Sequence, residues 1–226
     1  MSQIILMSDP RVAAVPVEES GEPLVDLRAN TEILLDGRLA DPEGAFAHLR
    51  EGLAQRLLRA QKLLPDGLRF IVVEGYRPYS LQERYFTRYA GRLREANPDW
   101  PEDHLYVQTS RSLSPPHIAP HVCGAAVDLT LCTEAGEELP MGTEVNASPE
   151  ESDDACYTAA ANISVEARAN REILSKVLEE AGLTNYPTEW WHWSYGDRYW
   201  ALATGSGAAR YSHVNWPPAG RRELNR

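Results

Sequence analysis

The stretch HVCGAAVDLTL, residues 121–131, decides the fold because it joins a loop histidine to a strand that carries a carboxylate. Its second half alternates, so Ala126, Asp128 and Thr130 share one face and the apolar residues between them share the other. This pattern predicts a strand that covers an apolar layer with one face and presents Asp128 on the other. His121 comes just before the strand, and we expect its imidazole near that carboxylate.

A second stretch, TEWWHW at residues 188–193, supplies Glu189 and His192. Two imidazoles and one carboxylate make three protein ligands for a zinc ion and leave a fourth tetrahedral position for water: His121, Asp128 and His192. Glu189 is then a spare carboxylate that can act as the base for that water. Positions three apart face opposite ways in an extended strand, so we expect a bend between Glu189 and His192.

The segment EGYRP, residues 74–78, follows the run LRFIVV, which predicts a buried strand over residues 68–73. Arg77 emerges in the turn after this strand, where a permanently charged guanidinium can stabilise the oxyanion of a tetrahedral intermediate. The alternative is a structural role, with Arg77 as the ion-pair partner of Glu74.

Apolar spacing predicts three helices, over residues 42–64, 81–97 and 165–181. A proline-rich segment, residues 98–120, is expected to form a long loop, and the acidic segment 144–158 a loop over a cleft. EAGEE predicts a hairpin turn into a strand ending near Met141, and the last strand is expected over residues 188–194.

Helices and strands are therefore segregated, which favours an α+β fold. We expect a single domain over residues 1–226, with a small antiparallel sheet flanked by helices and the zinc site in a cleft at the sheet. Residues 1–40 are expected to wrap irregularly around it, and residues 206–226 to form a surface tail.

Composition restricts the partners. A chain of 226 residues with 43% hydrophobic content suits one globular domain with a sizeable core. The formal net charge of -11 opposes binding to nucleic acid or to an anionic membrane, so a small peptide is the expected partner. The N-terminus lacks a signal-peptide core, no window approaches the roughly 18 apolar residues of a membrane span, and three cysteines without CxxC spacing suit reduced thiols. These features predict a cytoplasmic protein.

The motifs occur in the order and at about the spacing of a known family: EGYRP, HVCGAAVDLTL, LPMGT, the Asn170–Arg171 pair and TEWWHW. Over roughly residues 70–200 the chain thus resembles the D-alanyl-D-alanine dipeptidases of vancomycin resistance, which are zinc D-amino-acid peptidases. The resemblance implies one zinc ion per chain, a catalytic glutamate at Glu189, a transition-state arginine at Arg77, and ligands at His121, Asp128 and His192.

Three positions depart from the family pattern, all of them in substrate recognition. The serine before the ligand histidine is Ala119, the aspartate that binds the dipeptide's ammonium is Asn146, and a tyrosine near the N-terminus is Ala29. A carboxylate facing an ammonium in a dry cleft contributes about 1.5–3 kcal/mol, so Asn146 should weaken binding of a free dipeptide about ten-fold or more. Glu144 or an acidic residue of segment 150–154 is the alternative anchor.

Other roles stay open for several residues. Asp128 is alternatively a hydrogen-bond partner of a ligand histidine, and Cys123 a thiolate ligand rather than a buried apolar group. His117 is expected in a loop, with ligation or substrate contact as the alternative, whereas His48 and His104 are expected on the surface. Three tryptophans are expected in the core and the cleft wall, with the second also against substrate: Trp190, Trp191 and Trp193.

Three functions follow. The first is zinc-dependent hydrolysis of the amide bond of a small D-amino-acid-containing dipeptide. The second keeps the zinc chemistry but acts on a different, modified peptide in a biosynthetic pathway. The third is a catalytically silent metal-binding scaffold, which the presence of Glu189 argues against.

Overall fold

The computed structural model describes residues 4–216. A five-stranded sheet with strand order β2-β4-β5-β7-β6 forms its centre. These strands are β2 (Leu34–Leu35), β4 (Leu68–Glu74), β5 (Ala126–Thr133), β6 (Thr184–Asn185) and β7 (His192–Ser194). A separate two-stranded sheet pairs β1 (Leu24–Asp26) with β3 (His48–Arg50).

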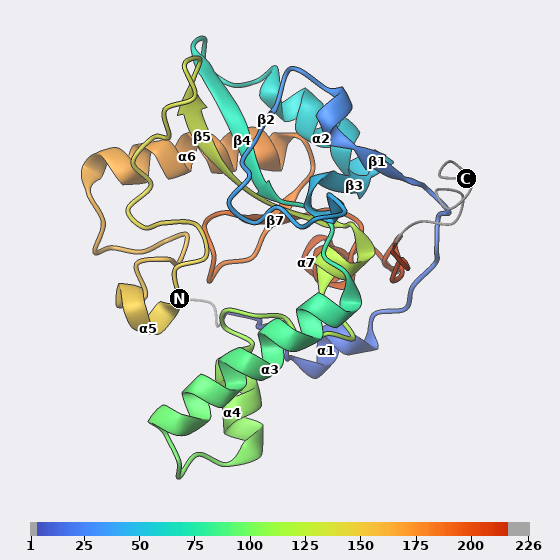
Figure 1. Ribbon diagram of the computed structural model, residues 1–226, viewed down its shortest axis with the longest axis vertical. Helices are drawn as coiled ribbons and strands as arrows, with labels where there is room; N and C mark the ends of the chain where they lie inside the picture. The colour runs from blue at the N-terminus through green and yellow to red at the C-terminus, as the bar shows by residue number, and fades with distance from the viewer. Residues whose placement is uncertain (1–3, 217–226) are drawn as a thin grey trace.

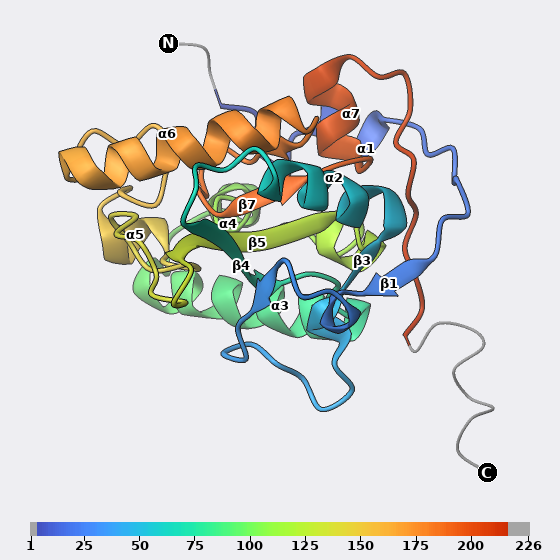
Figure 2. The same cartoon turned by 90° about the horizontal axis from the view of Figure 1, so that it is seen from above.

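The helices are α1 (Pro10–Ala14), α2 (Glu51–Gln61), α3 (Tyr79–Ala96), α4 (Glu102–Thr109), α5 (Pro149–Ser152), α6 (Val165–Glu180) and α7 (Arg198–Thr204). Some of them cover the two sides of the main sheet. Figure 1 shows α3 and α4 side by side as an arm below the sheet. In Figure 2, α2 and α6 lie on one side of β4 and β5, and α3 crosses on the other.

The predicted two-sided character of β5 is confirmed. Its apolar residues, among them Val127 and Leu129, are fully buried in the core that also contains Leu57 of α2 and Leu178 of α6. Asp128 projects from the other face because side chains alternate along a strand. The core thus lies between the sheet and two helices, and the site lies on the opposite face.

The α+β class is confirmed, but the sheet is not wholly antiparallel. β2 runs parallel to β4, with Leu34 opposite Ile71, and the connection between them contains α2. The N-terminal region is accordingly less irregular than predicted, since it adds strands to both sheets. A two-residue strand has too little alternation to be recognised by sequence spacing, and its pairing with β4 stabilises it instead.

The helix predicted over residues 42–64 is wrong in its first part. Residues 48–50 form β3, and α2 begins only at Glu51. Gly44 has a left-handed backbone with φ 70°, which interrupts a helix, and β1 offers an edge for the next residues to pair with. His48 is therefore buried in the small sheet, not on the surface, and its Nδ1 donates to the Gly44 carbonyl at 2.8 Å.

The long loop predicted over residues 98–120 contains a helix, α4. Proline at the position before its first residue and two acidic residues in its first turn suit a helix start. Leu105 packs against Tyr89 and Leu93 of α3, so tertiary contact stabilises a segment whose own sequence has weak periodicity. His104 is exposed on α4, as predicted.

Four other predicted elements have the expected positions, and two of them are shorter than predicted. α3 and α6 match their predicted helices, and the Ser164 hydroxyl caps α6 by accepting from the Ala167 amide. The hairpin after β5 turns as predicted, but its second arm is reduced to one bridge between Cys132 and Glu138. The last strand is shortened to β7.

The predicted surface tail is only partly at the surface. Tyr211 is buried, and Ala209 forms a bridge to Val17 of the N-terminal segment. Residues 217–226 lie outside the described residues. Within residues 4–216, no helix has both the length and the apolar character required to cross a bilayer.

Candidate metal centre and active site

The three predicted ligands lie together on one face of the sheet. Nδ1 of His192 is 2.9 Å from Oδ1 of Asp128 and 3.2 Å from Nε2 of His121, and the remaining pair is 3.4 Å apart. Two ligands of a tetrahedral zinc ion with bonds of about 2.0–2.1 Å are about 3.3 Å apart. All three side chains are buried, and their donor set can therefore hold a zinc ion.

Strand register places two of these groups. Asp128 of β5 is opposite His192 of β7 and, on its other side, opposite Glu74 of β4. Residues opposite each other in antiparallel strands have neighbouring side chains on the same face. A one-residue slip of either pairing would turn these groups to opposite faces.

The main chain orients the His121 ring. His121 lies in a 3-10 turn, Pro120–Cys123, and its Nδ1 is 2.7 Å from the Gly75 carbonyl oxygen. A carbonyl only accepts, so Nδ1 carries the hydrogen and Nε2 keeps its lone pair toward Asp128 and His192. Gly75 is required because a Cβ there would lie 2.5 Å from the His48 carbonyl oxygen.

The predicted bend before β7 is confirmed. The Glu189 amide donates to the Tyr186 carbonyl at 2.9 Å, and the His192 amide donates to the Glu189 carbonyl at 3.2 Å. This turn brings Oε2 of Glu189 to 3.7 Å from Nδ1 of His192. The fourth carboxylate therefore adjoins the candidate ligands.

The environment shifts the pKa values of the two carboxyl groups in opposite directions. Burial, together with the charge of Asp128, raises the pKa of Glu189 well above its ordinary value, against the opposing effect of Arg77. Burial would also raise the pKa of Asp128, but the adjacent His121 and His192 outweigh it and lower that pKa. Burial lowers the pKa of His192. An ionised carboxylate and neutral imidazole suit zinc binding, and Glu189 is suited to exchange a proton.

Arg77 is held rigidly beside the cluster. Its guanidinium donates to both carboxylate oxygens of Glu74 and, through Nη1, to Oε1 of Gln82 at 2.6 Å. The ion pair weighed for Arg77 in the sequence is thus present. The ion pair does not use the whole guanidinium group, because the bonds to Glu74 and Gln82 together take only three of its five N–H donors.

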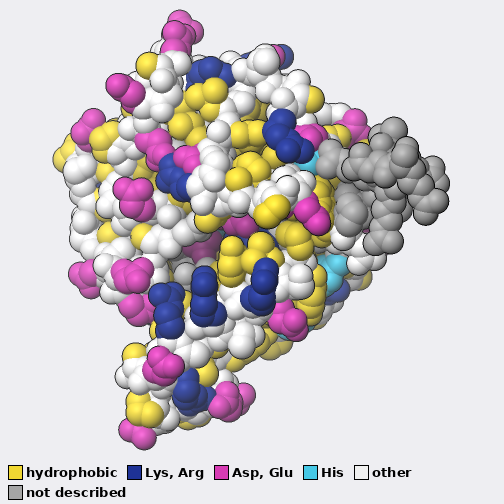
Figure 3. Space-filling model, in the orientation of Figure 1, with side chains coloured by type: hydrophobic (Ala, Val, Ile, Leu, Met, Phe, Trp, Pro, Cys, Tyr) yellow, Lys and Arg dark blue, Asp and Glu magenta, His cyan; other side chains and the backbone are white. Residues whose placement is uncertain are grey.

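A cavity of about 230 Å³ lies next to this cluster. Arg77, Asn146 and Trp191 all line it, so segment 144–158 does form part of the cleft wall, but it is not wholly a loop, because its residues 149–152 form α5. Ala119 is fully buried and does not line the cavity. Figure 3 shows acidic side chains recessed in a hollow near the centre of this face, with dark blue basic side chains along its lower edge.

Two other candidate ligands lie elsewhere. His117 and Cys123 line a different cavity of about 360 Å³ together with His213. Burial raises the pKa of the Cys123 thiol to about 12, which opposes thiolate formation. All three cysteines are free and buried, and the three tryptophans of TEWWHW are buried as predicted.

Sequence reasoning missed two residues that line the cleft and one that holds Arg77 from behind it. Gln82 holds Arg77, whereas Arg88 and Arg92 of α3 line the cavity. Arginines four positions apart share a helix face, so their spacing was a usable signal for the last two. No spacing in the sequence indicates Gln82, because its hydrogen bond with Arg77 depends on the direction in which α3 leaves the turn after β4.

Comparison with known proteins agrees with these motifs. Residues 27–212 match Peptidase M15, the D-Ala-D-Ala dipeptidase family. The chain is 29% identical over 219 residues to D-alanyl-D-alanine dipeptidase from Synechocystis sp., covering 83% of this chain and 87% of that protein. It is 31% identical over 150 residues to D-alanyl-D-alanine dipeptidase from Enterococcus faecium, covering 64% of this chain and 71% of that protein. Among solved structures, the LdcB LD-carboxypeptidase is 15% identical with a TM-score of 0.45, over 85% of this chain and 76% of that chain.

Proposed function

Because the chain belongs to the D-Ala-D-Ala dipeptidase family of zinc metallopeptidases, we propose that it hydrolyses the amide bond of a small D-amino-acid-containing dipeptide. In this proposal one zinc ion per chain is held by His121, Asp128 and His192. The observation that carries it is the spacing of their three donor atoms, 2.9–3.4 Å, with Glu189 adjoining them.

Zinc in such a site polarises a carbonyl group and lowers the pKa of a water molecule. Glu189 is the general base that takes the proton of the attacking water, and its raised pKa lets it keep that proton until the leaving amine needs it. Only 9% of Glu189 is exposed, so bulk solvent competes little for the proton. The same side chain thus serves as base and then as acid.

Arg77 stabilises the negative charge that develops on the substrate oxygen. The bonds to Glu74 and Gln82 fix the guanidinium plane and leave two N–H donors for the substrate. A donor that is already in position needs no reorganisation during the reaction, and loss of one such donor typically costs about 10²–10³ in turnover.

Substrate recognition should differ from that of a site in which an aspartate binds the ammonium group of a free dipeptide. Asn146 lines the cavity and offers only a neutral amide, but Glu151 lines the same cavity. A modified peptide is therefore the second candidate substrate, favoured by the missing charge at Asn146. A silent scaffold is disfavoured because Glu189 is buried beside the three donors.

Metal content and turnover test the proposal together. Purified protein should contain about one zinc ion per chain, and chelation should abolish hydrolysis of D-Ala-D-Ala and its analogues. Glu189→Ala should retain the metal and lose hydrolysis, whereas Glu83→Ala, at an exposed position of α3, should change neither. Activity that survives chelation, or normal activity of Glu189→Ala, would refute the mechanism.

A further inference from the structure

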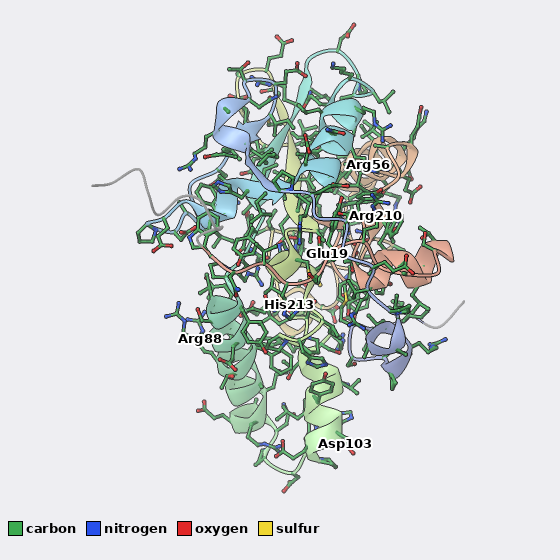
Figure 4. The ribbon with its side chains drawn as sticks, turned by 90° about the vertical axis from the view of Figure 1, so that its right-hand side faces the viewer. Glu19, Arg56, Arg88, Asp103, Arg210 and His213 are labelled. Carbon is green, nitrogen blue, oxygen red and sulfur yellow. The ribbon has the colours of Figure 1, made fainter. Side chains whose placement is uncertain are left out.

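The cavity beside the candidate active site has one strongly basic wall. Arg88 and Arg92 of α3 line it together with Arg77, and both are exposed. Figure 4 shows Arg88 projecting from α3 on the side away from α4. The two positions are about one helical turn apart on the same face of α3, a backbone rise of about 6 Å along the axis.

These two arginines have no ion-pair partner of their own among the described residues. Each contacts an aromatic ring instead: Arg88 lies 5.5 Å from the ring centre of Tyr85, and Arg92 lies 5.2 Å from that of Tyr89. Tyr85 also contacts Arg77 at 5.2 Å. Stacking on rings fixes the direction of a guanidinium while leaving its N–H edge available for an anion.

The charges around the cavity do not balance. Arg77 and Glu74 neutralise each other as an ion pair. The other charged residues of the wall are Arg88, Arg92 and Glu151. A zwitterionic dipeptide would use one carboxylate for its ammonium and one cation for its terminal carboxylate, which leaves one arginine without a counter-charge.

We propose that Arg88 and Arg92 form an anion-binding wall and that the preferred substrate is a small peptide with net negative charge, bearing a second carboxylate besides its terminal one. This inference rests on the proposed function for the identity of the reaction. It assigns specificity to these two side chains, not a part in bond cleavage. An acidic D-amino acid in either position of a dipeptide supplies the required group.

Matched peptides test the preference. D-Glu-D-Ala compares with D-Gln-D-Ala, and D-Ala-D-Glu with D-Ala-D-Gln, because each pair differs in one charge at nearly constant shape. We expect at least one glutamate peptide to have a kcat/KM about ten-fold above its glutamine partner. The double variant Arg88→Gln/Arg92→Gln should remove this preference through KM. KM should rise more for the glutamate peptides, which lose a counter-charge for each of two carboxylates, than for the glutamine peptides, which lose only the one for their terminal carboxylate.

Arg84→Gln is the matched control. Arg84 is exposed one turn earlier on α3 but does not line the cavity. Its removal lowers the net charge by one unit, as each substitution of the double variant does, and should leave the preference intact. Equal rates for both members of each peptide pair would overturn the proposal. So would a preference that persists in the double variant, or one that Arg84→Gln abolishes to the same extent.

Binding separates this inference from the proposed function. Calorimetric titration of the four peptides into Glu189→Ala protein, with and without the two arginine substitutions, measures the preference without turnover. Tighter binding of a glutamate peptide through the two arginines, in a protein whose wild type hydrolyses nothing, would refute the proposed reaction and support the anion-binding wall. Hydrolysis of these peptides with no preference for the glutamate peptides, in rate or in binding, would support the proposed reaction and refute the anion-binding wall.

Discussion

At the scale of single residues, the candidate site depends on groups that fix the direction of the functional side chains. The Gly75 carbonyl selects the His121 tautomer, and Glu74 with Gln82 holds Arg77. These contacts use atoms that carry no catalytic chemistry themselves. They explain why a few motif residues are insufficient to build the site without their neighbours.

Arg77→Lys should separate the two roles of this position. Lysine keeps the charge but cannot form the forked bond to Glu74, so we expect kcat to fall about 10²–10³-fold while zinc content is retained. Steady-state kinetics with metal analysis measures both. A loss below about ten-fold would leave Arg77 with only the structural role.

Asn146→Asp should restore a carboxylate that can face a substrate ammonium. Asn146 has a left-handed backbone, φ 67°, which aspartate also tolerates, so the variant should fold normally. We expect kcat/KM for D-Ala-D-Ala to rise about ten-fold.

An N-acetylated analogue, which has no ammonium, is the control for this change and should gain nothing. An unchanged rate for free D-Ala-D-Ala would show that the charge missing at this position does not limit recognition. Glu151 would then be the anchor to test next.

At the scale of elements, β5 is the part on which both core and site depend. One face completes the apolar core and the other carries Asp128, while the turn that leads into the strand positions His121. Gly124 ends that turn in a left-handed conformation, φ 66°. A β-carbon there would lie 2.3 Å from Cδ2 of Leu24, so β1 closes over the turn without space to spare.

Gly124→Ala should therefore lower the free energy of unfolding by about 2–3 kcal/mol, from the left-handed backbone and the contact with Leu24. Gly91→Ala is the control and should have the opposite effect, because Gly91 is an exposed residue of α3 and a β-carbon there would have nothing within 4 Å. That change should stabilise the protein by about 0.5–1 kcal/mol. Urea denaturation midpoints measure both, and a neutral Gly124→Ala would contradict the packing described for the turn.

At the scale of the whole molecule, the two ends of the described chain run alongside each other. Glu19 accepts from the Ser212 amide at 2.6 Å, and Glu22 accepts from the Tyr211 hydroxyl at 2.6 Å and from the Gly52 amide at 2.8 Å. Figure 4 shows Glu19 and Arg210 on this side of the molecule. These carboxylates join the N-terminal segment, the C-terminal segment and α2.

This contact predicts a loss of stability in acid. Burial alone would raise the pKa of both glutamates. Hydrogen bonds outweigh burial and lower each pKa below its ordinary 4.5, mainly those from Ser212 to Glu19 and from Tyr211 to Glu22. A group whose pKa is lowered by folding stabilises the protein above its unfolded pKa, and that contribution disappears as pH falls below about 4.5.

The double variant Glu19→Gln/Glu22→Gln should have a lower melting temperature at pH 7 and a smaller further decrease between pH 5 and pH 3 than the unaltered protein. Thermal unfolding at several pH values measures this. Identical pH profiles for the two proteins would rule out the two carboxylates as the source of acid sensitivity.

The sequence alone was sufficient for features that local chemistry determines. The alternation of residues 126–131 predicts β5, the Ser164 cap predicts the start of α6, and the spacing of the motifs predicts the His121, Asp128 and His192 cluster and the family. The bend before His192 also follows, because two side chains three positions apart cannot face one site from an extended strand.

Only the tertiary structure decided the features that depend on distant partners. β3 replaces the first part of a predicted helix because β1 pairs with it, and α4 forms within a predicted loop because Leu105 has α3 to pack against. Arg88 becomes a cleft residue because α3 crosses the side of the sheet that carries the site. Local periodicity cannot report such contacts, since their free energy comes from segments that meet only when the chain has folded.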